Sequence, residues 1–351
     1  MYSINIIQPD DWHIHLRDEN TLKMTVPLAE AAFGRVLAMP NLTPPLTTVQ
    51  SVLDYRSRIL ANTRNPHFTP YFALYFNEQL TADTLQEAKT CPWILGVKWY
   101  PRGATTHSDW GVEDISQHFE HLALMEELKL PLLIHGEVTD STVDIFEREP
   151  RFIETVLMPL QQRFPKLPIV LEHITTLDAV QWIQNMPAHI AATVTAHHLA
   201  FNRNHLLAGG LKPDYYCLPV LKQAAHQYSL QQAVMTSGQT QFFLGTDSAP
   251  HTRDKKYNSC GCAGCFTTPV ALALLAELFF ENQALSLLEA FCSINGARFY
   301  QLPLNTQHLR LTQQDWVVPE HYQISGLTFV PLLAGQTLAW QYHIAENVHH
   351  E

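Results

Sequence analysis

The sequence predicts a single (β/α)₈ barrel, an α/β fold in which parallel strands alternate with helices. The chain has 351 residues, of which 46% are hydrophobic, and this is enough for one large core. Apolar runs typical of buried strands recur along the chain, and amphipathic segments separate them. Because this alternation repeats eight times, a closed barrel is favoured, and an open doubly wound sheet remains the structural alternative.

Several of the expected strands are unbroken apolar runs, such as LPLLIH and LPIVLEH, as parallel strands covered on both faces require. The eight segments are Asp11–His15, Arg35–Met39, Pro70–Phe76, Ile94–Trp99, Pro131–His135, Ile169–His173, Ile190–Ala196 and Phe242–Thr246. Helical spacing of apolar residues predicts helices at residues 49–60, 112–125, 223–234, 270–280 and 285–291, and after residue 177. No glycine-rich nucleotide-binding motif follows any strand. We expect one unit over residues 1–351, with a C-terminal decoration from about 305 to 351 that holds one or two strands (Leu327–Val330, Thr337–Tyr342).

Charge and targeting signals narrow the class of protein. The formal net charge is −11, from 22 basic and 33 acidic residues, so neither nucleic acid nor an anionic membrane is an expected partner. The opening MYSINIIQPDDWHIH lacks the basic and apolar regions of a secretory signal. The most apolar stretch, Pro269–Phe280, is too short to span a bilayer and contains Glu277. We therefore expect a cytoplasmic protein with a small-molecule substrate.

The cysteines allow two interpretations. Cys91, Cys217 and Cys292 stand alone, whereas Cys260, Cys262 and Cys265 form a C-x-C-x-x-C cluster. Such a cluster can bind a structural zinc, but no second half with paired ligands is present. A glycine-rich loop near the substrate, with reduced thiols, is the preferred interpretation. No ligand role is expected for His197, His198 or His205, and His349 and His350 are expected in a tail.

Reactive groups of a barrel enzyme sit at the carboxyl ends of its strands. Candidate metal ligands lie at or near the ends of five expected strands: His13 and His15, Lys98, His135, His173, and Asp247. Residues two apart on a strand face the same side, so both imidazoles of the His-x-His pair can reach one ion. Any one of these histidines alone would more often be an ordinary hydrogen-bonded residue. Their joint placement at one rim predicts a metal site.

Lys98 lies within the apolar run ILGVKWY. A lysine that is buried, charged and unpaired costs several kcal/mol, on the order given for buried ions. One explanation is a side chain that extends to the barrel mouth. The sharper hypothesis is a neutral amine that has reacted with CO₂, giving a carbamate that bridges two metal ions.

Longer motifs in a fixed order carry a family resemblance. HIHLRD, AMPNLTPP, GVKWYP, LLIHGEV, LEHITT and LGTDSAPH follow one another, with FNRNH, YCLPVLK and CGCAGCF between or after them. Together they resemble the amidohydrolase superfamily and, more closely, dihydroorotases of the short, bacterial-type class. The resemblance runs from about Pro9 to beyond Ala334, and only ATTHSDWG departs from the family pattern, after its two threonines.

The resemblance implies a reaction and a metal centre. The reaction is the reversible cyclisation of N-carbamoyl-L-aspartate to L-dihydroorotate and water, a step of pyrimidine biosynthesis. Two zinc ions per subunit are implied, the more buried one bound by His13, His15 and Asp247, the more exposed one by His135 and His173. N6-carboxylated Lys98 and a hydroxide, the nucleophile, would bridge them, and Asp247 would act as general acid and base. On ligand chemistry alone, zinc, cobalt and manganese all remain open.

The resemblance also implies substrate contacts and a homodimer. Arg17 and Asn41 would bind the substrate carboxylate, aided by His251 and the backbone around Ala263. Leu218 would contact the pyrimidine ring through its backbone, and His15 and His135 would also touch substrate. Thr105 and Thr106 would form the tip of a mobile loop. Without the resemblance, Arg17 could equally pair with Asp18 or a helix end, and Asn41 could be a turn residue.

Three other functions are alternatives for such a sequence. A hydantoinase or allantoinase would share the metal ligands, but these enzymes usually carry a larger β-sandwich built from both chain ends, and the short lead before His13 argues against it. A mononuclear deaminase would not need Lys98. A non-catalytic barrel that acts as a binding scaffold would be expected to lose ligands, whereas all six candidates remain.

Overall fold

The predicted barrel is present in the computed structural model, which describes residues 2–106, 108–259 and 261–344. Eight parallel strands follow one another around it in chain order. They are β2 (Asp10–Ile14), β3 (Arg35–Ala38), β4 (Thr69–Tyr75), β5 (Ile94–Trp99), β6 (Leu132–His135), β7 (Ile169–Glu172), β8 (Ile190–Val194) and β9 (Phe242–Leu244). The barrel closes between its first and last strands, β2 and β9. There the Asp247 amide donates to the His13 carbonyl (2.8 Å), and the His15 amide donates to the Ser248 carbonyl (3.0 Å). The fold class and all eight strands are thus confirmed, although several strands end one or two residues earlier than predicted.

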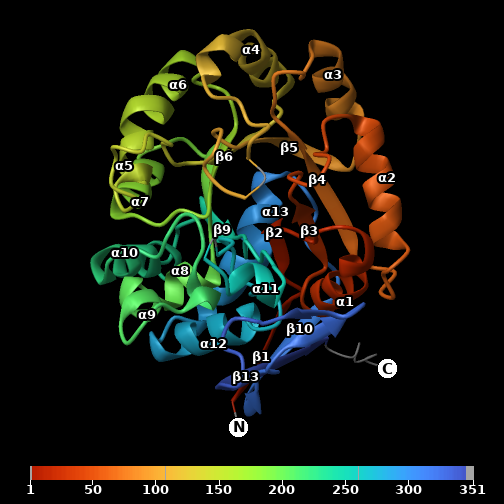
Figure 1. The fold of residues 1–351 in the computed structure, drawn as a ribbon, viewed down its shortest axis with the longest axis vertical. Coiled ribbons are helices and arrows are strands. Elements are labelled where there is room, and N and C mark those ends of the chain that lie inside the picture. Colours follow the sequence, from red (N-terminus) through yellow and green to blue (C-terminus); the bar gives the residue numbers. More distant parts are fainter. Residues whose placement is uncertain (1, 107, 260, 345–351) are drawn as a thin grey trace.

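Helices form an outer ring around the strands (Figure 1). The longer ones are α1 (Leu22–Ala32), α2 (Val49–Leu60), α3 (Ala82–Thr90), α4 (Phe119–Leu128), α7 (Leu177–Gln184), α10 (Ala224–Val234) and α12 (Ala271–Glu281). The shorter ones are α5 (Arg148–Phe152), α6 (Met158–Arg163), α8 (Ala196–Ala200), α9 (Arg203–Leu207), α11 (Arg253–Lys256) and α13 (Asn295–Phe299). Threonine hydroxyls accept backbone hydrogen bonds at the starts of α2, α3, α7 and α8, each contributing about 0.5–2 kcal/mol. One predicted helix, at residues 285–291, is wrong in type, because the chain forms a 3₁₀ turn (Leu285–Leu287) and then a π-helix (Ala290–Ile294).

Side chains pack the barrel interior below the rim. Trp12 stacks on Tyr300, with ring centroids 4.8 Å apart, and α13 closes this end of the barrel. Gly296 in α13 is required by the close approach, because a Cβ there would lie 2.0 Å from the Trp12 indole nitrogen. Arg35 forms a buried ion pair with Asp10 (Nη2–Oδ2 2.5 Å). The interior of the barrel is therefore filled with side chains at this end.

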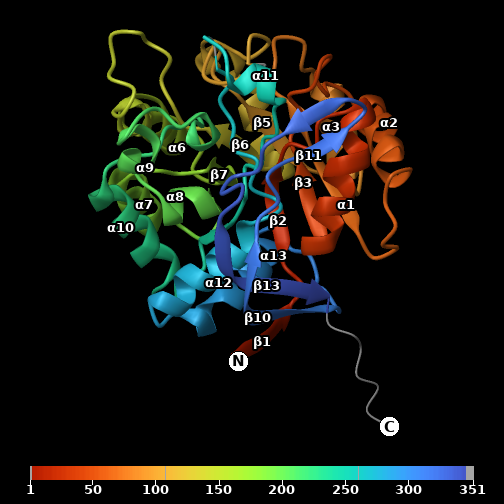
Figure 2. The same cartoon turned by 60° about the horizontal axis from the view of Figure 1, so that its bottom comes forward.

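The two chain ends form a second sheet at one edge of the molecule, with red and blue strands side by side in Figures 1 and 2. Its order is β1 (Ser3–Ile7), β10 (His308–Val317) and β13 (Thr337–Ile344), all antiparallel. A hairpin of β11 (Tyr322–Ile324) and β12 (Leu327–Phe329) completes the extension. The two predicted tail strands are confirmed, but β1, β10 and β11 were not predicted.

Among the described residues no helix has the length and apolar character needed to cross a bilayer.

Candidate active site

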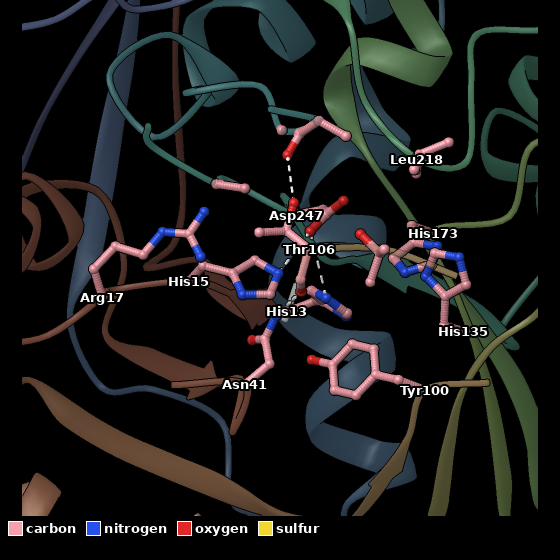
Figure 3. A pocket seen from close by; sticks show the side chains of 14 residues that line it. His13, His15, Arg17, Asn41, Tyr100, Thr106, His135, His173, Leu218 and Asp247 are labelled. Carbon is pink, nitrogen blue, oxygen red and sulfur yellow. Dashed lines mark hydrogen bonds and ion pairs between the residues drawn. The ribbon is translucent and has the colours of Figure 1, made fainter. Parts of the chain in front are cut away.

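Five of the six predicted metal ligands, all except Lys98, line one pocket at the barrel mouth (Figure 3). His13 lies in β2, Lys98 in β5 and His135 at the end of β6, while His15, His173 and Asp247 lie just beyond their strands. Their imidazoles form a row, with ring centroids 5.5 Å apart for His15–His13, 5.0 Å for His13–His173 and 4.8 Å for His173–His135. Side chains separated by more than 200 residues thus share one wall, as the strand-end argument predicted.

Asp247 joins the two histidines of the first strand. Its Oδ1 lies 3.0 Å from His15 Nε2 and 3.5 Å from His13 Nε2. Burial alone would raise the pKa of this carboxyl, but the His15 hydrogen bond and the neighbouring His13 lower the pKa to about 2. Asp247 is therefore an anion at neutral pH, able both to bind a cation and to accept a proton.

Lys98 has an unusual environment for an amine. Its side chain is 0% exposed, and Nζ has no hydrogen-bond partner among the described residues. The nitrogen lies 5.0 Å from the ring centroid of Tyr100. Burial lowers the pKa of Lys98 to about 8, against the opposing charges of Glu172 and Asp247. The alternative of a lysine that extends to solvent is wrong, since the amine is buried.

Two glutamates orient imidazoles from behind. Glu172 Oε2 accepts from His13 Nδ1 (2.8 Å), and Glu137 Oε2 lies 2.8 Å from His135 Nε2. A carboxylate that holds one ring nitrogen leaves the other available as a ligand, as is usual around bound metals. The neighbouring His173 Nδ1 is buried and has no partner in the described part of the chain. This set of imidazoles, carboxylate and unpaired amine fits a metal centre.

Three site residues adopt left-handed backbone conformations that only glycine takes freely. Arg17, His173 and Asp247 have φ values of 62°, 42° and 46°. Such conformations cost on the order of 1–3 kcal/mol each and cluster at functional sites. At His173 the turn comes directly after the last residue of β7, which is why that strand ends before the predicted limit, whereas Asp247 lies three residues beyond the end of β9.

A pocket opens beside the row of imidazoles. Arg17 is half-buried in its wall, where Nε donates to the Pro250 carbonyl (3.0 Å) and Nη2 lies 3.0 Å from His251 Nε2. The alternative pairing with Asp18 is wrong, because Asp18 pairs with Arg58 (2.7 Å). No carboxylate within the described residues forms an ion pair with Arg17. Its charge is therefore free for an anion in the pocket.

The loop after β5 lies over this pocket. Thr105 and Thr106 both line it, and the Thr106 carbonyl accepts from Asn41 Nδ2 (3.1 Å). The Thr106 hydroxyl lies 3.4 Å from the Ala263 carbonyl. Leu218 lines the same pocket. Most of the residues that the resemblance assigned to substrate and loop thus line one pocket, whereas His251 lies outside its lining and contacts Arg17. Asn41 is a pocket residue rather than only a turn residue.

Sequence reasoning missed the residues that support the ligands. Besides Glu172 and Glu137, Asp11 accepts from the Thr246 amide (2.8 Å) and hydroxyl (2.5 Å), directly before Asp247. Thr193 donates to Glu172 (2.5 Å). The signal existed for Glu172, since a glutamate in the apolar run LPIVLEH is as unexpected as a lysine in ILGVKWY.

Several other histidines and cysteines that the sequence analysis named lie in different environments. His198 is satisfied by Thr195 Oγ1 (2.8 Å) and the Pro219 carbonyl (3.0 Å), and His205 caps the start of α9. Cys217, expected to stand alone, lies beside Cys265 and His197. Cys260, His349 and His350 lie outside the described residues.

Comparison with known proteins agrees with this geometry. Residues 6–309 match the model of the amidohydrolase family. A dihydroorotase of Aliivibrio fischeri (strain MJ11) is 49% identical over 340 residues, which cover 97% of this chain and 99% of that protein. One from Shewanella denitrificans is 50% identical over 342 residues, with the same coverage.

Solved structures of dihydroorotases are also similar to this chain. A dihydroorotase from Campylobacter jejuni has a TM-score of 0.89 at 34% identity, covering 98% of each chain. One from Saccharomyces cerevisiae, in complex with 5-fluoroorotic acid, has a TM-score of 0.91 at 31% identity and covers 99% of this chain and 100% of that one. An L-hydantoinase from Arthrobacter aurescens has a TM-score of 0.77 at 15% identity, covers 97% of this chain and 84% of its own, and shares the fold alone.

Proposed function

The chain belongs to the amidohydrolase family and, within it, to the dihydroorotases, and from this premise we propose how its residues divide the work of the reaction. The reaction is the reversible cyclisation of N-carbamoyl-L-aspartate to L-dihydroorotate and water. One observation carries the assignment: the unpaired guanidinium of Arg17 and the His13–His15–Asp247 cluster line the same pocket. A site for an anion thus adjoins a site for a cation, as hydrolysis of a cyclic amide that carries a carboxylate requires.

Two zinc ions are proposed as the cofactors. His13, His15 and Asp247 would hold one ion, and His135 and His173 the other. When bound, such ions polarise a carbonyl and lower the pKa of water to about 7. The orientation of His13 by Glu172 and of His135 by Glu137 supports this donor set, because each glutamate contacts only one nitrogen of its imidazole.

Carboxylation of Lys98 is proposed to complete the centre. The neutral amine attacks the carbon of CO₂, an N–C bond forms, and one proton leaves, so the product is an anionic carbamate. The buried, unpartnered Nζ supports this step, because the carbamate replaces an isolated ammonium by an anion next to four imidazoles. It would supply oxygen donors between the two proposed ions.

Asp247 is proposed to carry the proton. In the hydrolytic direction it accepts the proton of the attacking hydroxide and gives it to the amide nitrogen as the C–N bond breaks, so the product is a carboxylate. In the biosynthetic direction the ureido nitrogen attacks the side-chain carboxylate carbon, and Asp247 passes the nitrogen's proton to the leaving oxygen. This oxygen departs as hydroxide and takes one further proton from solvent to become water. General acid–base catalysis of this kind contributes typically 10²–10⁴-fold.

Arg17, Asn41 and His251 are proposed to hold the substrate carboxylate. Burial lowers the pKa of His251 to about 2, with the Arg17 charge as the next contribution, so His251 is a neutral ring at this position. The backbone at Leu218 and Ala263 would contact the ring of the substrate, with His15 and His135 beside it. The Thr105–Thr106 loop would close over the bound substrate and exclude water, because in its present position it contacts both Asn41 and Ala263.

A cytoplasmic homodimer is proposed from the family resemblance. Size-exclusion chromatography with light scattering would test it, with twice the chain mass of 39.9 kDa as the expected value.

The experiment that tests the function compares dihydroorotate with hydantoin and allantoin as substrates of one purified sample. We expect kcat/KM for dihydroorotate to exceed kcat/KM for hydantoin and for allantoin by about 100-fold or more. The reason is that these two substrates lack the carboxylate that would pair with Arg17. Arg17→Met should remove most of this preference by raising KM for dihydroorotate. Equal turnover of the three substrates would contradict the assignment and favour a hydantoinase-like enzyme.

A further inference from the structure

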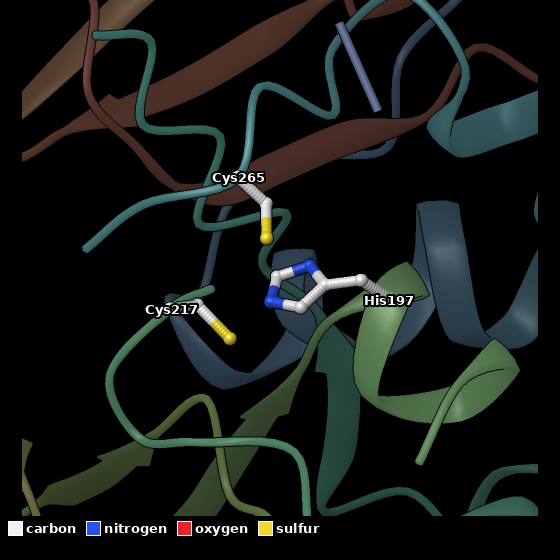
Figure 4. A group of neighbouring side chains, drawn as sticks. All are labelled: His197, Cys217 and Cys265. Atoms are coloured by element: carbon white, nitrogen blue, oxygen red, sulfur yellow. The ribbon is translucent and has the colours of Figure 1, made fainter. Parts of the chain in front are cut away.

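A second group of metal-binding side chains lies behind the pocket wall. It consists of His197 at the start of α8, Cys217 in the loop before α10, and Cys265 in the loop before α12. One ligand atom from each lies within 4.8 Å of those of the other two, and all three side chains are buried. Figure 4 shows both sulfur atoms pointing toward the His197 ring.

His197 is the unexplained member of this group. Both of its ring nitrogens are buried and have no hydrogen-bond partner among residues 2–106, 108–259 and 261–344. The adjacent His198 has partners for both nitrogens, so the local fold does provide hydrogen bonds where an imidazole is purely structural. A buried polar atom without a partner costs about 1–3 kcal/mol, and native proteins rarely retain one without a reason.

We propose that His197, Cys217 and Cys265 bind one thiophilic divalent cation, Zn²⁺ in the cell, at a site separate from the catalytic centre. Two cysteines and a histidine are a donor set that zinc sites use. On binding, the two S–H bonds break, two metal–sulfur bonds form, two protons pass to solvent, and the imidazole binds through an unprotonated nitrogen. No oxidation or reduction takes place, and the two thiolates neutralise the charge of the ion.

The surroundings hold the ligands in place before an ion binds. The buried ammonium of Lys256 donates to the carbonyls of Tyr216 (3.0 Å), Cys262 (3.0 Å) and Gly264 (2.8 Å), so one cation joins the two cysteine-bearing loops. A hydrogen bond with Cys265 and burial raise the pKa of the Cys217 thiol, whereas the Lys256 charge opposes this shift. The metal-free site therefore holds a neutral thiol at Cys217, and binding is expected to strengthen as the pH rises.

The position of the site suggests what the ion does. Leu218 follows Cys217 directly, Gly264 precedes Cys265 directly, and both line the substrate pocket. An ion bound behind them would tie α8 to both loops and hold this wall of the pocket in one conformation. We therefore expect loss of the ion to raise KM for dihydroorotate more than it lowers kcat.

Titration of the purified holoenzyme with Cd²⁺ tests the proposal independently of activity. Cadmium bound to thiolate gives an ultraviolet charge-transfer band, and the catalytic ligands, which are imidazoles and oxygens, give none. We expect the band to saturate at one ion per chain, and to be absent in Cys217→Ser and in Cys265→Ser. His197→Gln, which keeps much of the ring's volume, should weaken Cd²⁺ binding by about tenfold or more, at least the loss seen when a metal site loses a supporting partner.

Two cysteine variants serve as controls. Cys292→Ser removes a buried thiol elsewhere and Cys262→Ser removes a half-buried thiol of the sequence cluster, and both should keep the band. Zn²⁺ should raise the Tm of the wild type more than that of Cys217→Ser, a comparison that remains valid if the variant is less stable. A band that survives in Cys217→Ser and Cys265→Ser, or that disappears in Cys262→Ser, would overturn the proposal. So would a Cys217–Cys265 disulfide in protein purified without oxidant.

Discussion

Glu172 offers a test of how the barrel prepares its metal ligands. Its Oε2 accepts from His13 Nδ1 at 2.8 Å and from the Thr193 hydroxyl at 2.5 Å, deep inside the rim. Glu172→Gln keeps the size of the side chain but removes its charge. A hydrogen bond to a charged group contributes about 1.5–3 kcal/mol, against about 1 kcal/mol for a neutral one. The difference of roughly 0.5–2 kcal/mol corresponds to about 2- to 30-fold, since 1.36 kcal/mol is tenfold.

Loss of a residue that hydrogen-bonds to a metal ligand typically lowers metal affinity or activity by 10–100-fold. A decrease of about tenfold lies within this range and within the range of about 2- to 30-fold from the hydrogen-bond energies. We expect Glu172→Gln to lower Zn²⁺ affinity, measured by competition with a chelator, and kcat for dihydroorotate, with KM little changed. Glu30→Gln is the matched control, because Glu30 is a buried glutamate outside the pocket that accepts from the Arg64 and Asn65 amides (2.9 and 3.0 Å). Unchanged metal affinity and kcat in Glu172→Gln would refute the role assigned to Glu172.

Three further variants separate chemistry from stability. Asp247→Asn should lower kcat by about 10²–10⁴-fold, the contribution of a general acid–base group, while circular dichroism shows an intact fold; a near-normal kcat would remove Asp247 from the mechanism. Lys98→Ala should lose activity and recover part of it when a short carboxylic acid is added, whereas a mass of unmodified lysine in active wild-type enzyme would disprove carboxylation. Arg35→Met should lower the free energy of unfolding by about 3–5 kcal/mol, because it leaves the buried Asp10 carboxylate without its partner, and denaturant titration measures this loss. The folded fraction of Arg35→Met should keep its kcat, and a large drop in kcat would show that this ion pair also shapes the site.

The barrel and the ligands at its rim could be predicted because both depend on short stretches of sequence. A buried parallel strand is an apolar run, and its carboxyl end in a barrel faces the site, so His135 and Lys98 could be placed from their position in a run alone. The limits of the strands were less predictable. His173 turns into left-handed backbone directly after the last residue of β7, and nothing in its side chain signals this.

What was missed depends on contacts between distant segments. β1 becomes a strand by pairing with β10, some 300 residues later, and no local pattern reveals that partner. Asp18, the acidic neighbour of Arg17 in the sequence, pairs with Arg58, which lies 40 residues further along the chain. Cys217 belongs with Cys265 rather than alone, since two loops that are remote in sequence meet behind the pocket. In each case the missing information is which segments become neighbours, and the hydrophobic pattern does not contain it.

The central claim is that residues from separate strands jointly hold a pair of catalytic cations. Zinc titration of the metal-free Cys217→Ser/Cys265→Ser enzyme tests it most directly, because this variant lacks the additional sulfur site. Dihydroorotate turnover should rise with added zinc and reach its plateau at two ions per chain. Full turnover in the metal-free enzyme, or a plateau at one ion per chain, would contradict the account.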